Sequence, residues 1–361
     1  MDKKIEKLIS LIHNEKIKNF RYSTYGFQKD FSINDNINYG YIPFLDTLNP
    51  IFVNAILPDI YKTNRNCEIR ENTEFICIHD TLSASPRGTI KMHDNWIQGM
   101  ANDPKNTNTV SWHFIISDKY IYQHLPLNEI AHHAGDGLAH PLFYTDTEIK
   151  ADETIPVFSI SDDGFYEIIN LKTSIKVPLD ANGNIPKTEQ LPTNGINYII
   201  NENGNYSLGN TWFSSTYQKV GNFGGNLNSI GIETCVNAGI DYNDVMRNTA
   251  RVVAELLIKY NLHINRVKQH NNFSGKDCPM TMRRSNRWDE FIKLVELEKY
   301  YLDNFKNIKI KFTSLSPEIL DECGRIIKYI PNKEIKYKIT FIGENFEKEI
   351  ILKSVLDNCN F

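Results

Sequence analysis

The chain has 361 residues and a mass of 41.8 kDa, more than the roughly 100–200 residues of one domain, so we expect several structural units or one elaborated domain. Hydrophobic residues make up 41% of it and charged residues 23%, values that are typical of a soluble globular protein and exclude wholesale disorder. The 40 Lys and Arg against 44 Asp and Glu give a net charge of -4, which argues against a protein built mainly to bind nucleic acid.

The opening sequence, MDKKIEKLISLIHNEK, predicts a short amphipathic helix. Charges interrupt it before an apolar core of about 7–15 residues is reached, so we expect no secretory signal. No later stretch approaches about 18 uninterrupted apolar residues, so we expect no membrane insertion. The sequence therefore predicts synthesis in the cytoplasm. The six cysteines are dispersed along the chain, which does not favour a disulfide framework.

Hydrophobic periodicity then predicts strands interleaved with helices. In chain order these are a strand at 74–79, a helix at 93–100, strands at 111–117, 119–124 and 229–236, and helices at 241–260 and 282–302. This alternation predicts an α/β fold class.

The chain is predicted to have three parts. Residues 1–70 form an N-terminal extension of unknown role, and residues 71–302 form the main domain. Within it, residues 138–228 contain turn clusters such as DDG and NENGN and carry a net charge of -5, which predicts a long, acidic, β-rich insertion. We favour a solvated β-meander packed on the core over a surface that contacts a polymer or partner. Residues 303–361 predict a small α/β module with a helix at 317–329, suited to wall binding or assembly.

The segment KQHNNFSGKDCP, residues 268–279, places His270 and Cys278 eight residues apart on a turn-rich loop that can fold back on itself. Imidazole and thiolate are the preferred ligands of zinc. His79, which ends the strand EFICIH, is the best candidate for a third ligand. Such a set leaves a fourth position open for water, as in catalytic zinc sites. Asp277 competes with Cys278 as a ligand, but thiolate is the softer donor.

Four segments in order carry a resemblance to a known family: ICIHDT at 76–81, SWHFIISDKYIYQHLPLNEIAHHAGDG at 111–137, SIGIETCVN at 229–237 and KQHNNFSGKDCP at 268–279. They resemble the zinc-dependent N-acetylmuramoyl-L-alanine amidases of phage and prophage endolysins and of peptidoglycan recognition proteins. The resemblance implies a mixed central β-sheet flanked by helices. Four ordered motifs are far harder to obtain by chance than any one of them.

The resemblance also implies roles for individual residues. It makes His79, His270 and Cys278 the ligands of one zinc ion, and Glu233 and Lys276 the catalytic pair beside it.

In that pair, Glu233 is the general base and Lys276 stabilises the oxyanion. His133 matches a family position near the substrate groove, with a satisfied structural histidine as the equally weighted alternative, and Trp112 is expected to line that groove. Trp112 stands where some relatives carry Tyr, and an indole cannot exchange a proton as a phenol can. We interpret Cys77 and Cys235 as core thiols.

The implied activity is hydrolysis of the amide bond between N-acetylmuramic acid and the L-alanine of the peptidoglycan stem peptide. Peptidoglycan is the expected partner, and the expected setting is a phage or prophage lytic protein that reaches the wall after holin-type release or as part of a virion. The alternatives are a non-catalytic peptidoglycan-binding module and a virion tail structural protein with incidental lytic activity.

Overall fold

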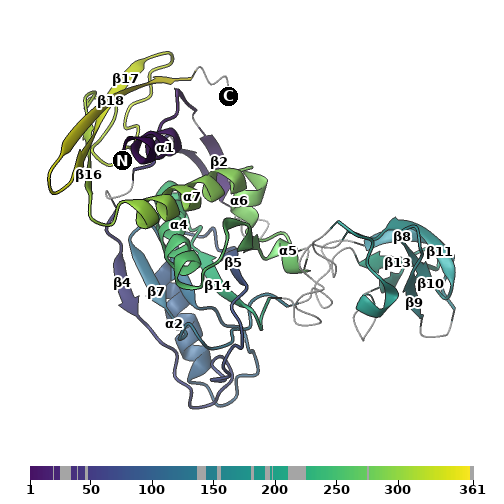
Figure 1. Ribbon diagram of the computed structural model, residues 1–361. Helices are drawn as coiled ribbons and strands as arrows, with labels where there is room; N and C mark the ends of the chain where they lie inside the picture. The colour runs from purple at the N-terminus through teal and green to yellow at the C-terminus, as the bar shows by residue number, and fades with distance from the viewer. Residues whose placement is uncertain are drawn as a thin grey trace.

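A mixed six-stranded sheet forms the centre of the chain, as Figure 1 shows in this computed structural model. The structure describes residues 1–18, 20–24, 34–38, 40–44, 48–135, 144–152, 156–179, 183–191, 196, 198–209, 225–274 and 276–357. Across the central sheet the strands run in the order β15 (Val267–Gln269), β5 (Phe75–Asp80), β14 (Ser229–Thr234), β6 (Phe114–Ile116), β7 (Tyr120–Gln123) and β4 (Ile51–Asn54).

The first four strands in this order are parallel, β6 and β7 are antiparallel, and β4 is parallel to β7. The predicted α/β class with a mixed, helix-flanked sheet is confirmed. The four predicted strands correspond to β5, β6, β7 and β14. The edge strands β4 and β15 were not predicted, because runs of four and three residues are too short to show a period.

Helices α2 (Ile90–Ala101), α4 (Tyr242–Lys259) and α7 (Trp288–Asn304) pack around this sheet, and α4 lies along α7. The Asp241 side chain caps α4 by accepting hydrogen bonds from two backbone N–H groups of the first turn. The helix predicted at 282–302 is confirmed from Trp288 onward, but its start is wrong. The chain instead forms α6 (Met280–Arg284) and α7, because Asn286 between them has a left-handed backbone with a φ of 55°.

The two ends of the chain form one hydrophobic core. Strands β1 (Lys16–Ile17), β18 (Glu347–Leu356), β17 (Glu334–Ile342) and β16 (Lys309–Ser314) make a four-stranded sheet, and the apolar face of α1 (Asp2–Ile12) shares its core. The N-terminal extension therefore supplies the helix that covers the C-terminal strands. It also contributes a two-stranded sheet of β2 (Phe20–Thr24) and β3 (Asn34–Asn38).

The helix predicted at 317–329 is wrong, because this segment forms turns and isolated bridges. The Asp321 carboxylate accepts hydrogen bonds from the backbone N–H groups of Cys323 and Arg325, and Gly324 has a φ of +74°. Side chains of this kind offer the backbone an alternative to helical hydrogen bonds.

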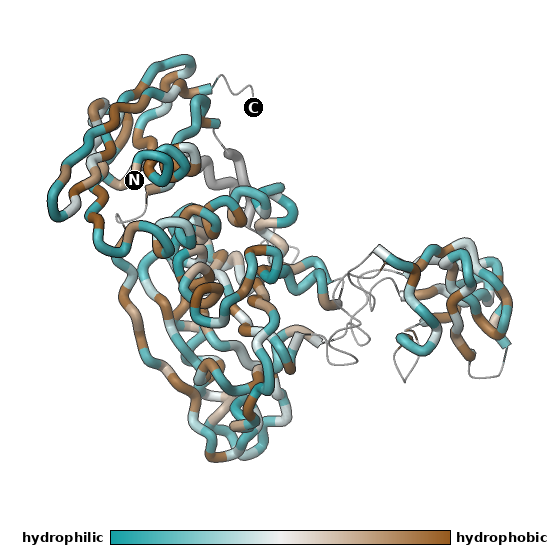
Figure 2. Tube along the Cα trace, in the orientation of Figure 1, coloured by the Kyte–Doolittle hydropathy of each residue, from teal (hydrophilic) through white to brown (hydrophobic). Residues whose placement is uncertain are grey.

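In the predicted insertion, the described residues between 144 and 209 form short strands with a hydrophobic core of their own. This core shares no residue with that of the central sheet, so the expected packing on the main core is wrong. Figure 1 shows the strands of the insertion at the side of the molecule, away from the central sheet, and hydrophobic stretches recur along them (Figure 2). Its elements are β8 (Tyr144–Lys150), β9 (Phe158–Ile160), β10 (Phe165–Ile168), β11 (Leu171–Lys176), the 3-10 turn η2 (Thr188–Gln190), β12 (Tyr198–Ile200) and β13 (Asn205–Gly209). Among the described helices, none has the length and apolar character to cross a membrane.

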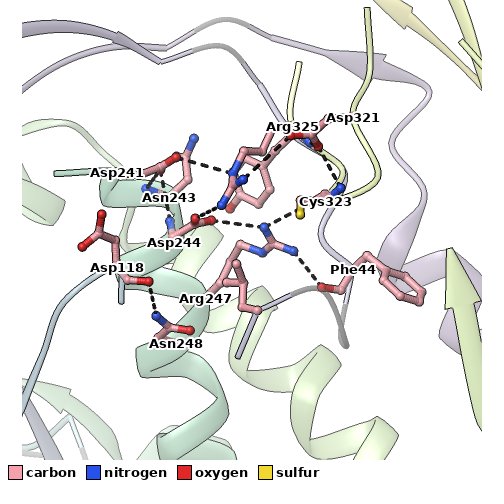
Figure 3. A network of polar contacts seen from close by, with 12 residues as sticks. Phe44, Asp118, Asp241, Asn243, Asp244, Arg247, Asn248, Asp321, Cys323 and Arg325 are labelled. Atoms are coloured by element: carbon pink, nitrogen blue, oxygen red, sulfur yellow. Dashed lines mark hydrogen bonds and ion pairs between the residues drawn. The ribbon is translucent and has the colours of Figure 1, made fainter. Parts of the chain in front are cut away.

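A buried ion-pair network joins the terminal sheet to the central domain (Figure 3). Asp244 at the start of α4 accepts a hydrogen bond from Arg247 at 3.2 Å and also pairs with Arg325. Arg247 donates further hydrogen bonds to the backbone oxygens of Phe44, at 2.8 Å, and Cys323, at 3.3 Å. The Arg247 guanidinium therefore links three distant parts of the sequence, and Asp244 supplies its counter-charge.

We expect Asp244→Ala to destabilise the protein by about 3–5 kcal/mol, because it leaves the buried Arg247 guanidinium without its counter-charge. Urea denaturation measures the change. The matched control is Asp303→Ala, which breaks a partly exposed ion pair with Lys299 and should cost about 0–1 kcal/mol. Equal stabilities of the two variants would show that the network does not hold the units together.

Candidate metal centre

The carboxyl ends of three adjacent parallel strands bring the candidate residues together. His79 lies near the end of β5, and Glu233 is its register partner on β14. His270 follows β15 directly, and its backbone N–H donates to the oxygen of Ile78 at 3.1 Å. Because the side chains of a strand alternate, Ile78 fills the core while His79 faces the other side of the sheet. Ligand sites in open α/β sheets commonly form at such strand ends.

The loop after His270 folds back and delivers Cys278 to the same place. It passes through the short helix α5 (Asn271–Ser274), and the backbone N–H of Asn271 then donates to the oxygen of Cys278 at 3.0 Å. The Asn271 side chain also donates to the backbone oxygen of Lys276 at 2.9 Å. As a result the Cys278 Sγ lies 3.8 Å from the Nδ1 of His79.

His79, His270 and Cys278 form a buried group whose ligand atoms all lie within 4.8 Å of one another. The ring centroids of the two histidines are 4.6 Å apart. Two imidazoles and one sulfur match the donor set of a zinc site with an open fourth position. The residues therefore fit the metal that the sequence predicts.

The protonation states of the group are set by its burial. Burial lowers the pKa of His79 well below its ordinary value, so the ring is neutral and offers a lone pair. Burial also raises the pKa of the Cys278 thiol well above its ordinary value. A coordinating cation deprotonates such a thiol, so metal binding at this group releases a proton.

Glu233 lies beside the group, with its Oε1 3.9 Å from the Nδ1 of His79. Its other oxygen is buried and has no hydrogen-bond partner among the described residues. Burial raises the pKa of Glu233 to about 8, and the opposing charge of Lys276 limits the rise. A carboxyl group that titrates near neutral pH is suited to acid–base chemistry.

Comparison with known proteins adds to this geometry. The profile of the N-acetylmuramoyl-L-alanine amidase family matches residues 70–149 and 170–281, which together are more than half of the chain. The chain belongs to this family.

Individual relatives of this amidase family member are distant. Two curated Bacillus subtilis (strain 168) proteins are similar to it: N-acetylmuramoyl-L-alanine amidase CwlH, 25% identical over 60% of this chain and 51% of the relative, and XlyA, 23% identical over 60% and 42%. The chain thus spans about half the length of these relatives. A solved mutant endolysin from Bacillus subtilis is 22% identical, with a TM-score of 0.39 over 69% of this chain and 99% of that one.

This amidase-family chain has a second group of possible metal ligands, formed by Cys77, His79 and His133. However, the Nε2 of His79 lies 2.9 Å from the Nδ1 of His133. Two zinc–nitrogen bonds of about 2.0–2.1 Å at a tetrahedral angle hold their nitrogens roughly 3.3 Å apart. The observed distance is that of a hydrogen bond. The second group therefore holds the His79 ring by a hydrogen bond at Nε2, the nitrogen that does not face Cys278.

The two residues predicted to lie near the substrate groove are both largely buried. His133 is 8% exposed and lies behind His79, and Trp112 is 4% exposed and stacks on Trp96 of α2 with ring centroids 6.1 Å apart. Trp96 is 44% exposed and is the member of the pair that reaches the surface. The sequence analysis did not single it out, because a tryptophan in an amphipathic helix is usually a core residue.

Two acidic residues near the metal group hold its loop in place. Asp80, which sequence reasoning missed although it directly follows His79, accepts a hydrogen bond from the backbone N–H of Thr281 at 2.7 Å. Asp277, the alternative ligand, instead accepts hydrogen bonds from Arg283 at 2.9 Å and from Arg284 at 2.8 Å. The geometry thus favours Cys278 over Asp277 as the ligand.

We expect the contribution of Glu233 to the stability of the metal-free protein to fall as the pH rises from about 4.5 to about 8, because folded Glu233 retains a proton that the unfolded chain, with its ordinary pKa of 4.5, releases. Glu233→Gln removes this contribution. Urea denaturation across this pH range, after chelation, should show the stability of the variant rising relative to that of the wild type as the pH increases. Glu255→Gln, an exposed change on α4, is the control and should follow the wild type. Identical profiles for all three proteins would contradict the raised pKa.

Proposed function

We propose that this chain is a zinc-dependent amidase that hydrolyses the bond between N-acetylmuramic acid and the L-alanine of the peptidoglycan stem peptide. The observation that carries the proposal is the convergence of His79, His270 and Cys278 beside the buried carboxyl group of Glu233. Membership of the amidase family supports the choice of bond.

In this proposal the imidazoles of His79 and His270 and the sulfur of Cys278 hold the zinc ion. A zinc ion in such a site lowers the pKa of a bound water toward about 7 and polarises the scissile carbonyl. With the two imidazoles and the sulfur as its ligands, a bound zinc ion would keep a position open for the attacking water and the scissile carbonyl.

Glu233 is the general base and then the general acid. It takes a proton from the attacking water and returns that proton to the amide nitrogen of L-alanine as the carbon–nitrogen bond breaks. In the metal-free protein, burial raises its pKa to about 8. The charge of a bound zinc ion lowers that pKa, which favours the carboxylate form needed for the first step.

Lys276 stabilises the negative charge that develops on the carbonyl oxygen. It is half-buried, and its charge partly opposes the rise that burial causes in the pKa of both Glu233 and Cys278, so the cation acts on the site. A fixed cation in a site with little access to solvent stabilises an oxyanion more strongly than water does.

The setting that we propose is a phage or prophage lytic protein, based on the resemblance of the four motifs to prophage endolysins. Detection of the chain in intact virions would favour a virion component over holin-type release. Activity on cell walls that is lost with a chelator and restored by zinc separates the enzyme from a non-catalytic binding module.

Mass analysis of wall digests tests the bond that is cut. We expect new stem peptides that begin with a free L-alanine amine and glycan strands without peptides. Products with new reducing sugar ends, or peptides cut at another residue, would contradict the proposal.

We expect Glu233→Gln to lower the rate of wall hydrolysis by about 10²–10⁴-fold and Lys276→Met to lower it by about 10²–10³-fold. Both variants should bind one zinc ion per chain, as measured by elemental analysis. Glu255→Gln and Lys259→Met on α4 are the matched controls and should keep the wild-type rate. Near-normal activity of a site variant that retains zinc would refute the role given to that residue.

A further inference from the structure

Hydrogen bonds join Ser229, His133 and His79 next to the metal group. Their directions determine which nitrogen of each imidazole carries the proton. The Oγ of Ser229 donates to the backbone oxygen of Gly225 at 2.6 Å. A hydroxyl group has one proton, so toward the Nε2 of His133, 3.4 Å away, the same oxygen can only accept. The Nε2 of His133 therefore carries a proton.

The next step follows from the neutral imidazole, which has one donor nitrogen and one acceptor nitrogen. With its proton on Nε2, His133 offers Nδ1 as an acceptor, and this atom lies 2.9 Å from the Nε2 of His79. His79 therefore carries its proton on Nε2. The Sγ of Cys77 lies 3.1 Å from the same nitrogen, but a thiol is only a weak donor and a weak acceptor, so the shorter hydrogen bond with His133 decides the proton position.

The remaining nitrogen of His79 is Nδ1, and it bears the lone pair. This atom faces the metal group, 3.8 Å from the Sγ of Cys278 and 3.9 Å from Glu233. The hydrogen bond at Nε2 thus leaves the Nδ1 lone pair of His79 facing the metal group in the metal-free protein.

The His133 ring and its backbone are both fixed by neighbouring residues, so the ring keeps its Nδ1 toward His79. It lies against Gly231, where a Cβ atom would come within 2.6 Å of the ring, so only glycine leaves room. The Oδ1 of Asn226 accepts hydrogen bonds from the backbone N–H groups of His133, at 2.9 Å, and Ala134, at 2.7 Å.

We propose that Ser229 and His133 are positioning residues that lock His79 in the tautomer with Nδ1 free for a metal ion. The inference rests on the metal site of the proposed function and assigns to His133 a task other than contact with the substrate. Partners that fix the tautomer of a ligating histidine typically change metal affinity by about 10–100-fold when they are removed.

The direct test is nitrogen NMR of histidine-labelled, zinc-free protein, which reports the protonated nitrogen of each ring. We expect the proton of His79 on Nε2 and that of His133 on Nε2. Ser229→Ala removes the acceptor for the Nε2 proton of His133, so the rings of His133 and His79 should both show mixed tautomers. A wild-type His79 protonated on Nδ1 would overturn the proposal, whether or not the protein later binds zinc.

Zinc affinity, measured by competition with a chelator, separates positioning from packing. His133→Leu removes the acceptor and should weaken zinc binding by about 10–100-fold. His133→Asn places an amide oxygen where Nδ1 was and should bind zinc almost as tightly as the wild type. His132→Leu, which changes the neighbouring histidine, is the control and should have no effect.

Equal affinity of His133→Leu and wild type would overturn the proposal, as would an equal loss in the Leu and Asn variants. If His133→Leu does not fold, Ser229→Ala and the wild-type NMR spectrum still decide the matter. Failure of wild-type protein to bind zinc would refute the proposed function instead, and the tautomer measurement distinguishes the two failures.

Discussion

The site depends on the parallel pairing of β5 with β14 on one side and β15 on the other. The β14 register places Glu233 beside His79, and the hydrogen bond from His270 to Ile78 ends β15 at the same level. A slip of one residue in either pairing would turn the affected side chain to the opposite face of the sheet. The loop that carries Cys278 then needs only local hydrogen bonds to complete the group.

Burial raises the pKa values of the carboxyl groups in the site, and it also makes those groups destabilising. Glu233 and Asp80 each have a buried carboxylate oxygen without a hydrogen-bond partner among the described residues, and the pKa of each is raised by burial, to about 8 and about 7. Buried polar atoms without partners are destabilising, and they collect at functional sites. A bound cation offsets part of that cost, because it replaces missing interactions with a charge.

The sequence predicted the strands that carry His79 and Glu233 because each has a clear β pattern, and the loop at 268–279 because its ligand types are specific. It did not predict β15, which is three residues long and is defined by its neighbour β5. Nor did it predict that α1 would cover the C-terminal strands, because that contact joins residues about 300 positions apart and periodicity is a local signal. The supporting role of His133 was equally hidden, since it depends on the direction of hydrogen bonds in space.

The proposed metal centre holds one zinc ion by two imidazoles and one sulfur, with one position left for a small ligand. X-ray absorption at the zinc edge of the loaded protein tests it most directly. We expect a single sulfur at about 2.3 Å with the remaining nitrogen and oxygen ligands at about 2.0–2.1 Å, and loss of the sulfur signal in Cys278→Ser. A spectrum with no sulfur, or with a second sulfur contributed by Cys77, would contradict it.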